Sequence, residues 1–391
     1  MLRRARLSVA GVFLVHAAVA GTLAPRIPAI KSNLDLSDGA LGAALTGFAA
    51  GLFAGTRAAA WLVDRFGSRR VVRTGLPLLA LALVGPGLAG DLAGLTVALA
   101  ILGLASGLLD VAMNAQAVEV ERGYARPILS GLHGMWSLGL LVTSVVAAGV
   151  AATGVGVRTA FAAAAVVLVP VAIVVPLGLL PRGEPATRSR VLERAGRTRL
   201  PVAVLALGAI GFCSFLGEGA AADWSGVYAR DTVGAGSGLA AFAFTAFAVG
   251  MVASRFSADR LAAASGPVAV VRAGGVLAGL GLALGVAILA WPATFVAFAL
   301  LGLGLAPLVP IAFSAAGNLG GGARALGWVV TMSYLGSVLG PAAIGFVAHT
   351  VGLRTGLVIP AVLAFAAALL APFARTAAGA TAEPEREPPI P

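Results

Sequence analysis

Long apolar segments alternate with short polar or Gly/Pro-rich breaks along the whole chain. About 20 apolar residues are needed to cross the roughly 30 Å hydrocarbon layer of a membrane. Twelve segments reach that length, at residues 7–30, 38–62, 71–90, 93–118, 128–152, 159–180, 201–224, 237–257, 268–290, 292–317, 325–348 and 356–374. Continuous runs of this length exclude the short alternating strands of a membrane barrel. We therefore predict an all-α membrane protein with twelve transmembrane helices.

Composition supports this class and excludes others. The 391 residues are 59% hydrophobic and only 11% charged, whereas a soluble domain is roughly 25% charged. The net charge of +11 comes from Arg clusters between apolar runs, so we expect no nucleic-acid partner. The sequence contains no phosphate-binding loop, zinc-ligand spacing or nucleophile elbow. We expect no enzyme activity, cofactor or metal.

The distribution of basic residues predicts the topology. The first 24 residues imitate a secretory signal, but the apolar run continues to Ile30, so we expect it to be a span. With a cytoplasmic N-terminus, the inner segments hold 21 basic residues, and the outer loops hold only Lys31, Arg158, Arg230 and Arg354. Basic residues collect on the cytoplasmic side. Both termini are predicted to be cytoplasmic in a multi-pass protein of the bacterial plasma membrane.

The chain also repeats itself. Gly55, Asp64 and Arg65 recur 195 positions later as Gly250, Asp259 and Arg260. Residues 102–104 match 301–303 at an offset of 199, and residues 155–159 match 351–355 at an offset of 196. A basic segment at mid-chain separates six spans from six, which indicates a parallel structural repeat. We expect a first bundle at 1–180, a cytoplasmic linker at 181–200, a second bundle at 201–375 and a disordered cytoplasmic tail at 376–391.

The loop after the second span carries a recognisable motif. Residues 61–70 read Trp-Leu-Val-Asp-Arg-Phe-Gly-Ser-Arg-Arg, which resembles the signature of the major facilitator superfamily at its Asp-Arg-x-Gly-x-Arg core. The resemblance implies two six-helix bundles that rock about a midplane site. It also implies a conformational gate, which would consist of Asp64, Arg65, Gly67, Arg69 and Arg70, with Asp259 and Arg260 as the matching pair of the second half. A solvated topogenic loop is the alternative interpretation.

A narrower resemblance concerns the fourth, fifth and seventh spans. Residues 110–116, 130–137 and 217–225 are similar to a poorly characterised bacterial branch related to fucose permease. In the sugar–proton symporters of that group, an acidic residue on the fourth span takes part in proton coupling. Asp110 is the matching position. The resemblance therefore implies that Asp110 carries the coupled proton.

Residue spacing on the fourth span agrees with that role. Gly103, Gly107, Asp110 and Asn114 recur at intervals of four, three and four, so they share one helical face. A carboxylate in hydrocarbon is costly, and this face must contact protein or water. We expect Arg57, inside the second span, to pair with Asp110 and tune its protonation. Alternatively, the two form a static ion pair, or Arg57 extends to the cytoplasm.

Other intramembrane polar residues are candidates for substrate or proton contacts. Arg26 and Glu218 lie at similar depth on equivalent spans, and we expect them to form an outer gate or a substrate clamp, or else a structural pair. Asn114 and Gln116 are further substrate contacts. His133 is a candidate proton relay, although a lone intramembrane His is more often a packing residue.

Taken together, the sequence predicts a monomeric secondary transporter that moves a small solute by alternating access. We expect proton symport of a sugar or another polar metabolite, with the substrate, the proton and the lipid bilayer as partners. A drug or metabolite efflux antiporter would have the same architecture. A non-transporting receptor or scaffold is a further alternative, but it would not need polar residues on cavity-facing stripes of both halves.

Overall fold

The computed structural model describes residues 2–124, 128–181, 201–319 and 322–378. Over these residues the chain forms helices and no strands. Twelve of the described segments are long and apolar enough to cross a membrane. The predicted all-α class and the twelve spans are confirmed. Most of the proposed linker (182–200) and tail (379–391) lie outside the described residues.

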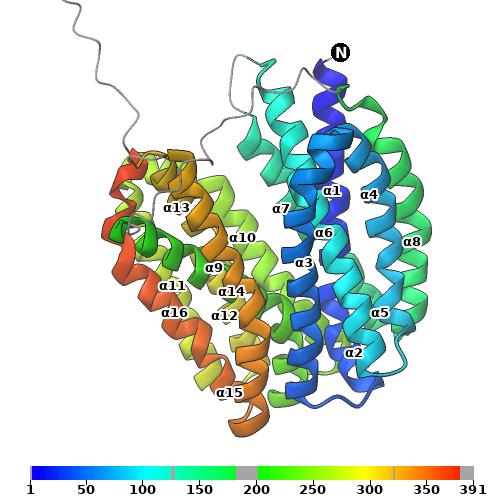
Figure 1. The fold of residues 1–391 in the computed structure, drawn as a ribbon. Helices are drawn as coiled ribbons and strands as arrows, with labels where there is room; N and C mark the ends of the chain where they lie inside the picture. The colour runs from blue at the N-terminus through cyan, green and yellow to red at the C-terminus, as the bar shows by residue number, and fades with distance from the viewer. Residues whose placement is uncertain (1, 125–127, 182–200, 320–321, 379–391) are drawn as a thin grey trace, which may run out of the picture.

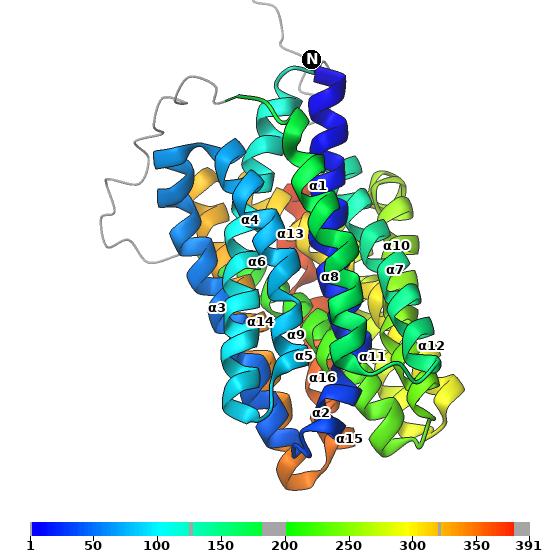
Figure 2. The same ribbon diagram turned by 90° about the vertical axis from the view of Figure 1, so that its right-hand side faces the viewer.

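The first half contributes six spans. They are α1 (Leu2–Leu23) continued by η1 (Ala24–Arg26) and α2 (Ile27–Asn33), α3 (Asp38–Phe66), α4 (Ser68–Ala82) continued by α5 (Val84–Leu88), α6 (Leu92–Glu121), α7 (Leu129–Ala152), and α8 (Val157–Val174) continued by η2 (Val175–Gly178). The short η1 turn at Pro25 breaks the first span, because proline cannot donate a helical hydrogen bond. Figure 2 shows α8 on the face of this bundle that is turned away from the second bundle.

The second half contributes the other six. They are α9 (Val202–Val227) continued by η4 (Tyr228–Thr232), α10 (Ser237–Ser265), α11 (Pro267–Ala287), α12 (Trp291–Leu305) continued by α13 (Leu308–Gly317), α14 (Gly322–Val351), and α15 (Leu353–Gly356) continued by α16 (Val358–Leu370) and η5 (Ala371–Ala378). The amide of Asn318, after α13, donates to the carbonyl of Thr376 at 2.9 Å. Figure 1 shows that the described chain starts and ends on the same side of the molecule. We call this side the N-terminal side.

The two halves repeat the same packing. Gly51 of α3 lies so close to the carbonyl of Ala100 that any side chain there would collide, and Gly250 of α10 lies equally close to the carbonyl of Ala299. The turn that ends α3 has Gly67 at φ 81° and ψ 146°, and the turn that ends α10 has Gly266 at φ 83° and ψ 155°. Both pairs of glycines are 199 residues apart (51 to 250 and 67 to 266). The predicted repeat is thus present in the backbone.

This register corrects one sequence match. An offset of 195 made Asp259 the counterpart of Asp64, but Asp64 lies three residues before Gly67 and Asp259 lies seven residues before Gly266. Asp259 therefore sits about one helical turn farther inside α10 than Asp64 does in α3. The sequence match failed because Gly55 was paired with Gly250, while packing pairs Gly51 with Gly250.

The bundles stand side by side and meet mainly through α3 with α14 and α7 with α10 (Figure 1). Their closest approaches lie opposite the N-terminal side, on what we call the far side. There Gly42 of α3 packs on Gly345 of α14, and Gly238 of α10 packs on Ala152 of α7. Backbones approach this closely only where side chains are absent or small. The far side of the described structure is therefore closed.

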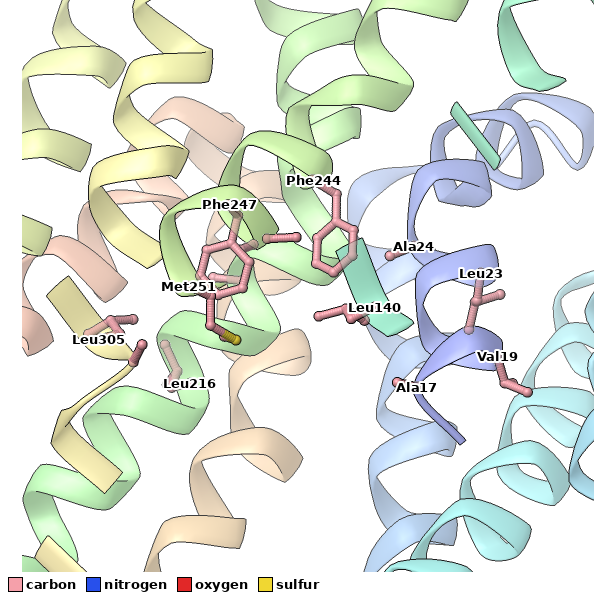
Figure 3. Packing of buried hydrophobic residues seen from close by; sticks show 14 of the residues in the cluster. Ala17, Val19, Leu23, Ala24, Leu140, Leu216, Phe244, Phe247, Met251 and Leu305 are labelled. Carbon is pink, nitrogen blue, oxygen red and sulfur yellow. The ribbon is translucent and has the colours of Figure 1, made fainter. Parts of the chain in front are cut away.

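Apolar side chains fill the contact between α10 and the first bundle. Phe244 and Phe247 of α10 stack with centroids 5.9 Å apart, and Phe244 lies toward Leu140 of α7 (Figure 3). Met251 follows one turn later and lies beside Leu216 of α9 (Figure 3). All five residues are buried. This cluster borders the polar residues described next.

Candidate functional site

A hydrogen bond between the two bundles marks the centre of the candidate site. The hydroxyl of Tyr334 on α14 donates to Oδ2 of Asp110 on α6 at 2.8 Å. Asn114 Nδ2, one turn farther along α6, donates to Asp110 Oδ1 at 3.3 Å. The rings of Tyr334 and of Phe215 on α9 pack in a T-shaped arrangement, with centroids 5.3 Å apart. An intramembrane carboxylate thus connects the first bundle to the second.

His16 of α1 extends this polar group within the first bundle. Its Nδ1 accepts a hydrogen bond from Trp136 Nε1 at 3.1 Å, and its Nε2 lies 3.2 Å from the carbonyl oxygen of Ser106. Indole nitrogen only donates, so Nδ1 carries no proton here. A carbonyl only accepts, so Nε2 carries the proton of a neutral imidazole. Ser106 lies one turn before Asp110 on α6, which sets His16 beside the central carboxylate.

The second bundle contributes a carboxyl group and a guanidinium group to the same central region. Glu218 of α9 is half-buried and accepts a hydrogen bond from Ser214 Oγ at 3.3 Å. Arg255 of α10 is half-buried and close enough to interact electrostatically with Glu218, but the two form no ion pair within 4.0 Å. His133 of α7 is in electrostatic range of both Arg255 and Asp110. Charged and ionisable groups of both bundles therefore share the centre of the molecule.

The expected pairing of Arg57 with Asp110 does not occur. The Arg57 guanidinium lies over the ring of Phe53, 4.8 Å from its centroid, and the side chain is exposed. Helix geometry explains the difference. Gly51 and Gly55 face α6, and a residue two positions after Gly55 is about 200° farther round the helix. Arg57 consequently points away from α6.

Gln116 also lies away from the centre. It is completely buried, and its Nε2 donates to Ser68 Oγ at 2.8 Å and to Glu119 Oε2 at 2.9 Å. Six residues after Asp110, it is about 240° round α6 from that carboxylate. Gln116 therefore does not share the central site with Asp110, and its role as a substrate contact stays an untested prediction. Gln116 instead braces Ser68, the first residue of α4.

Arg26 and Glu218 do not meet either. Arg26 is 3% exposed, and its Nη2 donates to the carbonyl of Val155, in the turn after α7. Glu218 lies two turns before Gly226, the residue of α9 that packs on Pro28 next to the η1 turn. The two side chains are therefore at different depths, and the proposed Arg26–Glu218 gate is absent among the described residues.

The motif after α3 has the expected local geometry. Gly67 adopts a left-handed φ of 81° between α3 and α4, which favours glycine. Asp64, Arg65 and Arg70 are exposed on the N-terminal side, and Arg69 is half-buried. Arg260 of the second half is also exposed. A gating role for these residues remains a prediction.

An ionic cluster holds the far side together. Its basic residues, Lys31 and Arg230, were predicted from the sequence only as charges of the outer loops. Lys31 of α2 forms ion pairs with Asp38 of α3 at 2.6 Å and with Asp231 of η4 at 2.5 Å. Arg230 donates from Nη1 to the carbonyl of Pro28 and from Nη2 to Ser32 Oγ, both at 2.9 Å. Lys31 and Arg230 thus tie the two bundles together. In the sequence, the sign of these contacts is an acidic residue close to each basic one: Asp38 follows Lys31, and Asp231 follows Arg230.

Residues 9–228 match the sequence profile of the Major Facilitator Superfamily. That match covers more than half of the chain. The chain belongs to the major facilitator superfamily. It is 32% identical to the uncharacterized transporter y4wD of Sinorhizobium fredii over 372 residues, which cover 93% of this chain and 96% of the relative. It is 31% identical to the membrane protein MosC of Rhizobium meliloti over 360 residues, which cover 90% and 85%.

Solved structures of other transporters share the fold. The nucleoside transporter NupG (D323A mutant) superimposes with a TM-score of 0.72 at 13% identity, covering 94% of this chain and 98% of that one. FucP in its outward conformation gives a TM-score of 0.64 at 19% identity, covering 94% and 97%. The expected superfamily and its paired bundles are confirmed, and this member is a membrane transporter and not an enzyme.

Proposed function

We propose that this superfamily member is a proton-coupled secondary transporter in which Asp110 carries the proton. The Tyr334–Asp110 hydrogen bond between the bundles is the observation that carries the proposal. A hydrogen bond to an ionised carboxylate is about twice as strong as one between neutral groups. Protonation of Asp110 would weaken the bond to Tyr334 and release the bundles. Proton uptake and bundle movement would then be one event.

The solute would bind between the bundles, beside Asp110. Asn114, His133 and Glu218 are half-buried or exposed in this central region, and they supply amide, imidazole and carboxylate groups for a small polar solute. The placement of Arg residues supports a cytoplasmic N-terminal side. The closed far side would then be the outer side, and this conformation would release solute to the cytoplasm or accept it from there. Each chain holds both bundles and all of these residues, which supports a monomer.

Proton movement in liposomes tests the proposal. Purified protein would be reconstituted with an entrapped pH-sensitive dye, and small polar solutes would be added one at a time. We expect at least one solute to drive proton movement in the wild type. Asp110→Asn should reduce that movement about tenfold or more while preserving exchange of the same solute.

Asp91→Asn is the matched control, because Asp91 is the exposed N-cap of the same helix and accepts from Gly94 N at 2.7 Å. Asn caps helices as well as Asp does, so this variant should keep full proton movement. Undiminished proton movement in Asp110→Asn would refute the assignment of Asp110.

A further inference from the structure

Arg255 is an intramembrane cation without a hydrogen-bond partner among the described residues. It lies on α10 within the membrane-spanning part Ser237–Ala258, inside the span predicted at 237–257. Its Nε is buried and unpaired. No carboxylate whose side chain the structure describes lies within ion-pair distance of it. An arginine stays ionised in proteins and carries five donors, so burying it unpaired is costly.

The repeat of the fold does not account for this arginine. The residue 199 positions earlier is Thr56, whose hydroxyl donates to the carbonyl of Phe53 in its own helix at 2.8 Å. The other arginine of that region, Arg57, is exposed and lies over the Phe53 ring. A half-buried cation at this depth is therefore specific to the second bundle. Packing of α10 on its neighbours does not require it, because α3 packs in the same way with Thr56 there.

The surroundings of Arg255 place it at the central site. Met251, one turn earlier, belongs to the apolar cluster with Leu216 and Leu305 (Figure 3), and Arg255 follows where that cluster ends. Glu218 of α9 and His133 of the first bundle are both within electrostatic range of Arg255. Glu218 in turn is held by Ser214. The buried Nε of Arg255 is thus an unused donor near these ionisable groups.

We infer that Arg255 binds an anionic group of the transported solute, and that this group is a carboxylate. The planar fork of a guanidinium matches the two oxygens of a carboxylate. A phosphate group is usually held by several cations or by helix N-termini, and Arg255 is the single arginine among the central residues named above. Glu218 acts as the positioning residue. This inference rests on the proposed function, because it takes the central region as the transport site.

Thermal unfolding of the full-length protein in detergent tests the inference. The probes are matched pairs: lactate with lactamide, succinate with succinamide, and gluconate with glucose, with glucosamine as the amine. We expect at least one carboxylate to raise the unfolding temperature when its uncharged partner does not. Arg255→Gln should weaken that binding about tenfold or more, and Arg255→Lys should weaken it less.

Arg272→Gln is the matched control, since Arg272 is an exposed arginine of the same bundle, and it should bind as the wild type does. If Arg255→Gln does not fold, the double variant Arg255→Gln/Glu218→Gln, which removes both charges, replaces it. The inference fails if no carboxylate stabilises the wild type or if binding survives the loss of Arg255. The thermal-unfolding test uses no proton gradient, so a failure of the carboxylate inference leaves the Asp110 proposal standing. Loss of proton coupling in Asp110→Asn likewise leaves the result on carboxylate binding unchanged.

Discussion

Tyr334 and Asp110 are 224 positions apart in the chain and are joined by a 2.8 Å hydrogen bond. One belongs to α14 of the second bundle and the other to α6 of the first. The bond is a direct polar link between an ionisable intramembrane group and the relative position of the bundles. Its removal should therefore change the conformational equilibrium as well as the local structure.

Tyr334→Phe removes only the hydroxyl and keeps the ring that contacts Phe215. A hydrogen bond to a charged group contributes about 1.5–3 kcal/mol, so we expect the far-side-closed state to lose population about tenfold or more. Spin labels would be placed at the exposed positions Asn33 of the first bundle and Thr232 of the second, both on the far side. Longer distances between the labels would report the change. Cys213 would first be replaced by Ala. An unchanged distance distribution would contradict the link.

Lys31 is the centre of the far-side cluster, with Asp38 and Asp231 as its partners. Of these two pairs, Lys31–Asp231 crosses between the bundles, and a partly exposed ion pair contributes about 0.2–1 kcal/mol. Lys31→Ala should therefore lower the population of the closed state by up to about fivefold and lengthen the same label distances. High salt should reproduce part of this effect in the wild type because it screens the pairs.

The charge exchange Lys31→Asp combined with Asp231→Lys provides the control for this cluster. It restores opposite charges across the bundles, and we expect the closed distances to return. If Lys31→Ala and the exchanged pair gave the same distances, the contact between bundles would not depend on these charges.

Gly67 and Gly266 occupy matching turns with positive φ. A residue with a side chain is strained there, at a cost of about 1–3 kcal/mol. Gly67→Ala and Gly266→Ala should each lower the unfolding temperature in detergent. Gly131→Ala, at a helical position of α7 where a methyl group meets no atom within 4 Å, should be neutral or slightly stabilising. Equal unfolding temperatures for all three variants would show that the turns carry no strain.

Local sequence pattern determined most of the fold. The lengths of the apolar runs predicted twelve spans, because the membrane fixes how many residues a helix needs. The break at Gly67, between the second and third spans, was readable as well, since the backbone freedom of glycine acts within a few residues. The motif at Asp64–Arg70 also identified the superfamily before any contact was known.

The partners of the charged side chains were decided by the tertiary structure. The sequence placed Asp110 on a polar helical face, but it paired that residue with Arg57, which packing turns away, and it overlooked Tyr334. Gln116 appeared to share the site because it is near Asp110 in the chain, yet helix rotation directs it to Ser68. Lys31 appeared to be only an outer-loop charge, and nothing in the sequence singled out Arg255. Helical periodicity fixes which residues share a face. The rotation and register of each helix against its neighbours depend instead on close contacts such as that of Gly51 with Ala100. Such contacts exist only in the folded bundle.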